Sequence, residues 1–148
     1  MIEDIYNFLP LTANLLSSGM PTAQQMADVS SSGVQVVINL AMPTSERALP
    51  DEEHLVESFG MKYIGIPVVW ENPTKENLED FMNAMDANRE KKTLVHCQAN
   101  YRATGFITLY RILRLDWEKA IAFEDLRRIW NPEDYPVWQK FLEENLNR

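Results

Sequence analysis

Cysteine is nearly missing from this sequence, whose 148 residues contain one, Cys97. A single cysteine excludes an internal disulfide and a cysteine-rich zinc site, and it suits a reducing compartment. Internal repeats and low-complexity tracts are also absent. With 45% hydrophobic residues, the chain is long enough to bury a substantial core, and we expect one domain over residues 1–148.

Basic residues are scarce relative to acidic ones. The chain has 14 Lys and Arg against 22 Asp and Glu, which gives a formal net charge of −8. Such a chain lacks the basic face that a phosphate backbone requires, so we expect no nucleic-acid partner. Any anion-binding site would be a locally positive region on a negatively charged protein. The overall field would then steer polyanionic substrates to that site poorly.

Long apolar runs are missing too, and none reaches the length needed to span a bilayer, so we expect no membrane partner. The first residues, Met1 to Asp4, lack the basic segment that opens a signal peptide. We therefore expect a cytoplasmic protein, and a signal peptide already removed from the N-terminus is left open as the alternative.

Strands and helices are expected to alternate along the chain. The run 34–40 has almost no polar interruption, which is typical of a strand buried on both faces. Strands alternating with helices predict a three-layer α/β fold, with a mostly parallel central sheet flanked by helices. The expected strands are residues 15–17, 34–40, 62–68 and 93–96, and the expected helices are residues 22–31, 51–59, 74–88, 103–113, 117–130 and 135–146.

The most informative segment is residues 93–105, which contain Cys97. An apolar pair at 94–95 predicts a short buried strand, and the apolar periodicity of residues 103–113 predicts a helix. A strand, a short loop and a helix together aim backbone N–H groups at an anion. The helix dipole and the nearby Arg102 both favour the thiolate form of the cysteine, which is its reactive form. The planar guanidinium of Arg102 also matches a tetrahedral oxyanion.

His96-Cys97 followed closely by Arg102 resembles the signature of the cysteine-based phosphatases, in particular the dual-specificity type. The likeness covers roughly residues 8–115 and implies the phosphotyrosine protein phosphatase II type of fold. It also implies a cysteine nucleophile, no metal or other cofactor, and a phosphorylated protein or small phosphoester as partner. Three further segments are similar to the family in the same order, namely residues 15–22, 33–40 and 60–68.

The loop departs from the family's pattern, because four residues rather than five separate Cys97 from Arg102. If the loop is one residue shorter, Arg102 does the work of the family's arginine. If it keeps the family's length, Ala103 stands in the arginine position and Thr104 in the hydroxyl position. Asn100 stands where the family has glycine, and asparagine is the non-glycine residue that best tolerates positive φ. The shorter loop also resembles that of rhodanese-type sulfurtransferases, which cradles a sulfur-centred substrate.

The general acid is harder to assign, because no aspartate occupies the loop after the expected strand 62–68. Glu71 is the nearest carboxyl group, and burial by Trp70 would suit it to protonate a leaving group. A surface glutamate with no catalytic role is the other interpretation. Asp51, in another loop at the same end of the sheet, is a weaker candidate.

Around Cys97 and Arg102, the remaining candidates take supporting roles. The resemblance implies that His96 hydrogen-bonds the loop and holds it open. Thr104 is either the hydroxyl that helps the thiolate leave or simply a polar residue at the start of a helix. Tyr101 either walls the pocket with Trp70 or belongs to the core. The expected substrate-binding residues are Gln98, Ala99, Asn100, Tyr101, Ala103 and Thr104, and no metal ligands are expected.

The sequence therefore favours a phosphatase-like hydrolase that acts on phosphoesters through a cysteinyl-phosphate intermediate. Phosphotyrosine proteins, phosphoserine proteins and small phosphoesters are not distinguished. Two alternatives stay open. One is a rhodanese-like sulfurtransferase or persulfide-handling enzyme. The other is a non-catalytic phosphate-binding pseudophosphatase, which the missing aspartate and the displaced arginine would explain.

Overall fold

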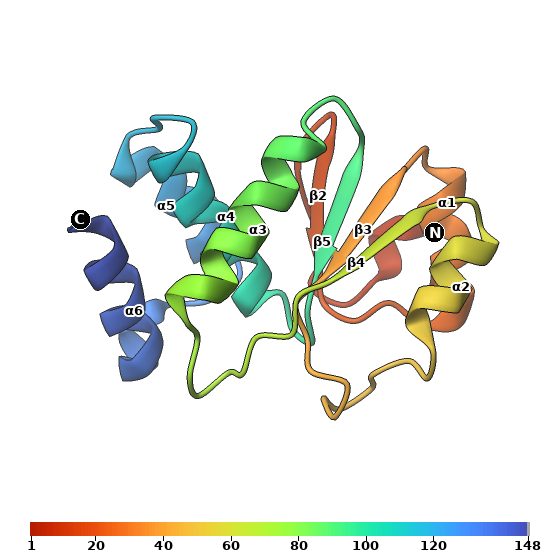
Figure 1. Cartoon of the computed structure of the whole chain (residues 1–148), viewed down its shortest axis with the longest axis horizontal. Coiled ribbons are helices and arrows are strands. Elements are labelled where there is room, and N and C mark those ends of the chain that lie inside the picture. Colours follow the sequence, from red (N-terminus) through yellow and green to blue (C-terminus); the bar gives the residue numbers. More distant parts are fainter. Residues whose placement is uncertain (148) are drawn as a thin grey trace.

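Five strands form one mixed sheet in the order β1-β2-β5-β3-β4 (Figure 1). The computed structural model describes residues 1–147. Strands β2, β5, β3 and β4 run parallel, and β1 pairs antiparallel with β2 at one edge. The strands are β1 Leu9–Thr12, β2 Leu15–Ser18, β3 Val36–Asn39, β4 Lys62–Gly65 and β5 Thr93–His96.

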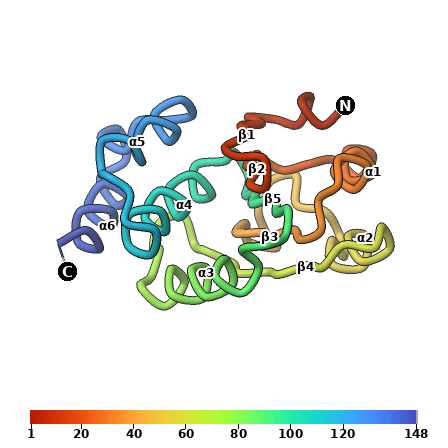
Figure 2. Tube along the Cα trace, turned by 90° about the horizontal axis from the view of Figure 1, so that it is seen from above, coloured from red at the N-terminus to blue at the C-terminus, as the bar shows by residue number. Residues whose placement is uncertain are grey.

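Helices cover both faces of this sheet. Helices α1 and α2 lie on one side, and α3, α4, α5 and α6 lie on the other (Figures 1 and 2). This three-layer arrangement confirms the predicted fold class. No helix among residues 1–147 combines the length and apolar composition needed to cross a membrane. The helices are α1 Ala23–Ser31, α2 Glu52–Ser58, α3 Lys75–Ala87, α4 Tyr101–Leu113, α5 Lys119–Arg127 and α6 Pro136–Leu146, with short 3-10 helices η1 Ile2–Asp4 and η2 Pro132–Asp134.

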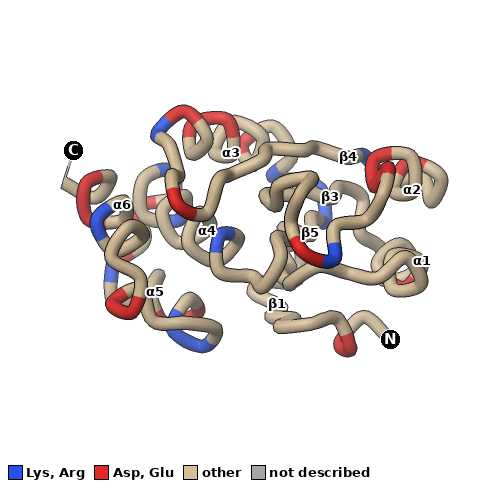
Figure 3. Tube along the Cα trace, turned by 90° about the horizontal axis from the view of Figure 1, so that it is seen from below, with Lys and Arg blue, Asp and Glu red and all other residues tan. Residues whose placement is uncertain are grey.

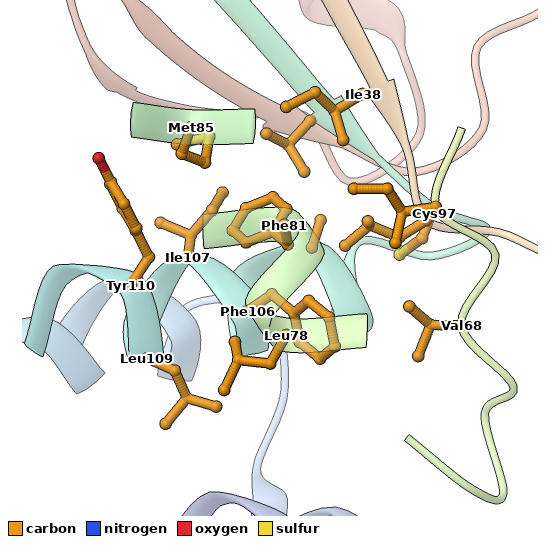
Figure 4. Close-up of a cluster of buried hydrophobic side chains, with 14 of the residues drawn as sticks. Ile38, Val68, Leu78, Phe81, Met85, Cys97, Phe106, Ile107, Leu109 and Tyr110 are labelled. Carbon is orange, nitrogen blue, oxygen red and sulfur yellow. The ribbon is translucent and has the colours of Figure 1, made fainter. Parts of the chain in front are cut away.

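The central strands are buried on both faces, as the uninterrupted apolar run 34–40 predicted. Successive side chains of a strand point to opposite faces. Ile38 of β3 and Val95 of β5 therefore join the core under α3, α4 and α6, while Val37 and Leu94 join the core under α1 and α2. Figure 4 shows part of the first core, in which side chains of α3 and α4 pack against the sheet.

The parallel strands bring four connecting segments to one edge of the sheet, which is the lower edge in Figure 1. In open α/β sheets, ligands bind outside the carboxyl ends of the strands. The segments that follow β2, β3, β4 and β5 are residues 19–22, 40–51, 66–74 and 97–100. The loop after Cys97 lies among them.

Several boundaries differ from the sequence-based expectations. Helix α4 begins at Tyr101 rather than at residue 103, because Asn100 takes φ +71° and turns the chain into the helix. Strand β4 ends at Gly65, short of the expected residue 68, although the N–H groups of Ile66 and Val68 still donate to the Asn39 and Leu40 oxygens. Strand β1 was missed, and its Pro10 is tolerated because β1 is an edge strand. Helix α5 begins at Lys119, two residues after the expected start.

Candidate active site

Cys97 directly follows β5 and is 1% exposed. It belongs to a pocket of about 310 Å³ at the carboxyl edge of the sheet. Figure 4 shows Cys97 and Val68 at one end of the apolar cluster. The pocket brings together six of the residues that the sequence singled out as its site. Its lining consists of Trp70, Glu71, Cys97, Gln98, Ala99, Tyr101, Arg102 and Tyr135.

The carbonyl groups of the loop all face the protein. The Gln98 oxygen accepts from Met20 N at 2.9 Å and the Ala99 oxygen accepts from Asn7 Nδ2 at 2.9 Å. The Asn100 oxygen accepts from the N–H and the hydroxyl of Thr104 within α4. Because the C=O and N–H of a trans peptide point in opposite directions, the N–H groups that follow turn toward the pocket.

Six consecutive N–H groups, those of residues 98–103, donate to no acceptor within residues 1–147. Three belong to the loop and three to the first turn of α4, where N–H groups have no partner inside the helix. Unpaired N–H groups at a helix N-terminus form a ready anion-binding site. The segment from Gln98 to Ala103 therefore has the donors that a tetrahedral oxyanion requires.

The N-terminal segment holds this loop in place. The side chain of Asn100 donates to the Asn7 oxygen at 2.9 Å and to the Ser17 hydroxyl at 3.0 Å. Gly19 allows the β2–α1 connection to approach, since a Cβ there would lie 2.7 Å from the Gln98 oxygen. Asn100 thus contributes to the site through its backbone, and its side chain serves as an anchor.

Arg102 is 5% exposed and lies in the same pocket as Cys97. Its Nη1 donates to the Val68 oxygen at 2.7 Å, which ties α4 to the segment after β4. No carboxylate within residues 1–147 pairs with it. If the loop kept the family's length, Ala103 would stand in the arginine position and Arg102 would be left to point to solvent. Arg102 is instead buried beside Cys97, which is the arrangement that the shorter loop requires.

Two expected substrate-binding side chains point away from the pocket. Ala103 is fully buried and belongs to the core under α3, α4 and α6. The Thr104 hydroxyl donates to the Asn100 oxygen at 2.7 Å and accepts from Trp130 Nε1 at 2.9 Å. Its role is therefore to close the first turn of α4 and to hold Trp130, which agrees with the helix-start interpretation. Only the N–H of Ala103 is left to face an anion.

The two candidate acids occupy different pockets. Glu71 lines the Cys97 pocket, but its side chain is exposed, so the burial by Trp70 that would suit it to act as an acid is not present, and its exposure agrees with the surface-glutamate interpretation. Trp70 packs instead on Tyr135 and Trp138, with ring centroids 5.3 Å away in each case. Asp51 lines a separate pocket beside α2, away from the cysteine. Glu71 is therefore the carboxyl group that the structure brings to the mouth of the site.

Aromatic rings wall the pocket and also join the core, so both interpretations of Trp70 and Tyr101 hold. Tyr101 stacks on Trp130, with centroids 5.2 Å apart and planes within 2°. Burial raises the pKa of Tyr101, and its hydrogen bond with Tyr135 raises it further. The phenol therefore stays protonated at neutral pH. Tyr135 was not expected at the site from the sequence, and η2 and the start of α6 bring it over the pocket.

His96 lies behind the loop and is fully buried. Its Nδ1 is 3.4 Å from the Cys97 carbonyl oxygen, as the supporting role implied, and its Nε2 is 2.7 Å from Glu52 Oε2. Glu52 was not expected here from the sequence, because nothing in a glutamate at a helix start indicates a buried partner 44 positions away. Residues 1–147 contain no group of three His, Cys, Asp or Glu side chains arranged to hold a metal ion.

Comparisons with known proteins bear on this arrangement. Two crystal structures of the "Putative phosphatase (DUF442)" from Shewanella putrefaciens CN-32 match the chain with TM-scores of 0.87 and 0.82. Their sequences are 41% and 40% identical, over 97% of this chain and 93% and 91% of theirs. No protein-family model matches the chain.

A more distant relative is the dual specificity protein phosphatase TpbA of Pseudomonas aeruginosa (strain UCBPP-PA14). It is 23% identical over 129 residues, which are 86% of this chain. The chain spans 56% of the length of this curated relative. A crystal structure of a TpbA variant in complex with phosphotyrosine has a TM-score of 0.74 at 19% identity, over 92% of this chain and 82% of the other. At that identity the likeness concerns the fold.

The fold and these relatives define a cysteine-based, phosphatase-like protein. The 41% identity over nearly the whole length of both chains is high enough to assign the chain to a family. The chain belongs to the DUF442 family.

Proposed function

We propose that this chain is a phosphoester hydrolase whose nucleophile is the thiolate of Cys97. The observation that carries the proposal is the buried guanidinium of Arg102, which has no carboxylate partner in residues 1–147 and lies in the pocket of Cys97. A buried charge without a partner is costly, so such a guanidinium favours an anionic ligand. The six unpaired N–H groups of residues 98–103 support the same ligand.

In the first step, the sulfur of Cys97 attacks phosphorus in line with the ester bond. The S–P bond forms, the P–O ester bond breaks, and the leaving oxygen takes up a proton. Water then attacks the cysteinyl phosphate, the S–P bond breaks, and inorganic phosphate and the thiolate are released. In both steps the N–H groups of residues 98–103 and Arg102 hold the three equatorial oxygens, whose charge they stabilise. In this mechanism Glu71, which lines the pocket, gives the leaving oxygen its proton.

The walls of the pocket favour a single phosphate on an aromatic or apolar alcohol. Trp70, Tyr101 and Tyr135 offer flat apolar surface, and Arg102 is the one cation among the described lining residues. Figure 3 looks at this edge of the molecule and shows acidic residues gathered on α2 and α3. Polyphosphorylated ligands would be repelled by this field. A phosphotyrosine side chain fits these requirements, and the fold relative TpbA has been crystallised with phosphotyrosine.

Hydrolysis of p-nitrophenyl phosphate tests the proposal. We expect turnover by the wild-type chain and a loss on the order of 10³-fold or more in Cys97→Ser, since the hydroxyl is a far weaker nucleophile at neutral pH. Turnover that survives this substitution would contradict the proposal. Phosphate binding without turnover in the wild-type chain would make the protein a pseudophosphatase.

One observation favours a second candidate function. The loop has four residues between Cys97 and Arg102, the length that resembles sulfurtransferases. In that reaction the thiolate takes the outer sulfur of thiosulfate, sulfite leaves, and cyanide then removes the sulfur as thiocyanate. Thiosulfate–cyanide rates measured on the same preparation decide between the two chemistries.

A further inference from the structure

A second pocket, of about 360 Å³, lies at the amino edge of the sheet, opposite the edge that carries Cys97 (Figure 1). Leu15 at the start of β2 and Thr93 at the start of β5 both line it. The rest of its lining comes from the β1–β2 turn, from the segment around the end of α3, and from the end of α4 with the residues after it. The volume falls in the range of small-molecule sites, about 300–1,000 Å³.

The walls of this pocket are largely apolar. Leu15 and Met85 line its inner part, where Met85 of α3 is 8% exposed. Leu115 and Trp117, in the segment after α4, lie nearer the surface, and Leu115 is 38% exposed. An apolar ligand that covers these side chains removes their surface from water, which favours binding. Methionine adapts its shape to such a ligand more readily than branched side chains do.

Arg111 brings hydrogen-bond donors to these apolar walls. It is 2% exposed, its guanidinium lies 4.1 Å from the centroid of the Trp117 ring, and its Nη1 donates to Asp125 Oδ2 at 2.7 Å. Its Nε and Nη2 donate to no acceptor within residues 1–147, and neither nitrogen is fully sealed from solvent. Because Arg111 lines the pocket, it offers fixed donors to a ligand there.

The charge of Arg111 is offset by Asp125, but Lys91 adds a cation that is not offset in this way. Lys91 is exposed, lines the same pocket and pairs with no carboxylate within the described residues. Of the other charged lining residues, Arg89 is bound to Asp86 at 2.8 Å, and Glu90 is exposed. The lining thus carries three cations and one acid on a chain of net charge −8. Such a pocket favours a ligand with one negative group.

We propose that this pocket binds a small apolar monocarboxylate. Its hydrocarbon part lies against Leu115 and Trp117, and its carboxylate accepts from Arg111 and Lys91. The site shares no lining residue with the Cys97 pocket. The proposal therefore goes beyond the proposed function and does not depend on it.

Titration with 2-naphthoate, followed by NMR of the indole N–H groups, tests the proposal. The chain has four tryptophans, of which Trp117 lines this pocket and Trp70 lines the Cys97 pocket. We expect a saturable shift of the Trp117 signal, whereas the Trp70 signal reports binding beside Cys97. The uncharged 2-naphthylmethanol should bind about tenfold or more weakly, because it lacks the charge-assisted hydrogen bonds of the carboxylate.

Three variants of exposed residues locate the ligand without disturbing the buried Arg111–Asp125 pair. Leu115→Glu places a negative charge among the apolar walls and should abolish the shift of Trp117. Lys91→Gln should lower the affinity by about twofold to fivefold, the effect of one exposed ion pair. Ile121→Glu is the matched control, because Ile121 is an exposed apolar residue of α5 outside the pocket. It makes the same change of charge and should leave the affinity unchanged.

A Trp117 signal that does not move up to the solubility limit of 2-naphthoate would overturn the proposal. A shift of Trp70 alone would also overturn it, since the carboxylate would then occupy the Cys97 pocket. Equal affinities for 2-naphthoate and 2-naphthylmethanol would contradict the role of the two cations. Leu115→Glu that is folded and binds 2-naphthoate as tightly as the wild-type chain would place the ligand elsewhere and so exclude this site.

Discussion

Replacement of Arg102 by alanine is the perturbation whose size follows most directly from the structure. A guanidinium has five N–H donors, and one of those of Arg102 is used by the Val68 oxygen at 2.7 Å. Two of the others can form a forked contact with an oxyanion. Hydrogen bonds to charged groups contribute about 1.5–3 kcal/mol each. Loss of both should weaken phosphate binding by about 3–6 kcal/mol, or roughly 10²–10⁴-fold.

Isothermal titration of phosphate or tungstate into the protein measures this change. Arg102→Lys should recover little of the loss, since a point charge cannot bridge two oxygens. Arg47→Ala is a suitable control, because Arg47 is an exposed cation on the same edge that lines a different pocket. We expect it to change the affinity by no more than about twofold, the effect of one screened surface charge.

Alanine at position 102 also leaves the Val68 carbonyl without its donor, so some stability should be lost, about 1–3 kcal/mol. Thermal unfolding of each variant separates this loss from the loss of binding. Folded Arg102→Ala that binds phosphate within about threefold of wild type would refute the reasoning, because a buried guanidinium at the anion would then contribute almost nothing.

Three further outcomes are expected. Gly19→Ala should cost about 1–3 kcal/mol in urea unfolding and weaken phosphate binding, because its Cβ would lie 2.7 Å from the Gln98 oxygen; unchanged values would mean that the loop tolerates displacement. Burial raises the pKa of Asp86, but hydrogen bonds from a tyrosine and two arginines outweigh it and hold that pKa below its ordinary value. The stability that the ionised Asp86 contributes is present above the unfolded pKa and is lost as pH falls through the folded pKa. Asp86→Asn should therefore lower the free energy of unfolding by about 1 kcal/mol at pH 7 and by progressively less below about pH 4. The control Asp80→Asn, at an exposed position, should change it little at either pH. Tyr135→Ala should raise KM for p-nitrophenyl phosphate several-fold and leave an alkyl phosphate little affected, since it removes one aromatic wall of the pocket; equal effects on both esters would argue against aromatic recognition.

The catalytic loop could be predicted from sequence because its signals are local. The strand before Cys97, the helix after it and the cation at Arg102 lie within a dozen residues of one another. The positive φ of Asn100 was foreseeable for the same reason, since few residues other than glycine and asparagine accept it. The loop length could be read from the sequence. The sequence did not show whether Arg102 or Ala103 would stand beside Cys97, because that depends on the contact of Arg102 with the Val68 oxygen.

The supporting residues could not be predicted, because their roles arise only when distant segments meet. Glu52 reaches His96 from 44 positions away, and Asn7 reaches Ala99 from 92 positions away. Neither has a motif of its own. Tyr135 lies in the C-terminal segment, beyond the region of family resemblance, and its place over the pocket is set by the packing of α6 on α4. The exposure of Glu71 has the same origin, since Trp70 packs on the C-terminal aromatic rings Tyr135 and Trp138 and does not cover it.

The covalent state of Cys97 during turnover tests the central claim most directly. The protein is mixed with p-nitrophenyl phosphate, quenched with acid in the steady state and digested, and the mass of the peptide that contains Cys97 is measured. We expect one phosphoryl group on the sulfur, and its absence in Cys97→Ser. Hydrolysis that proceeds with an unmodified Cys97, or a cysteine that takes up sulfur from thiosulfate but never phosphate, would contradict the account.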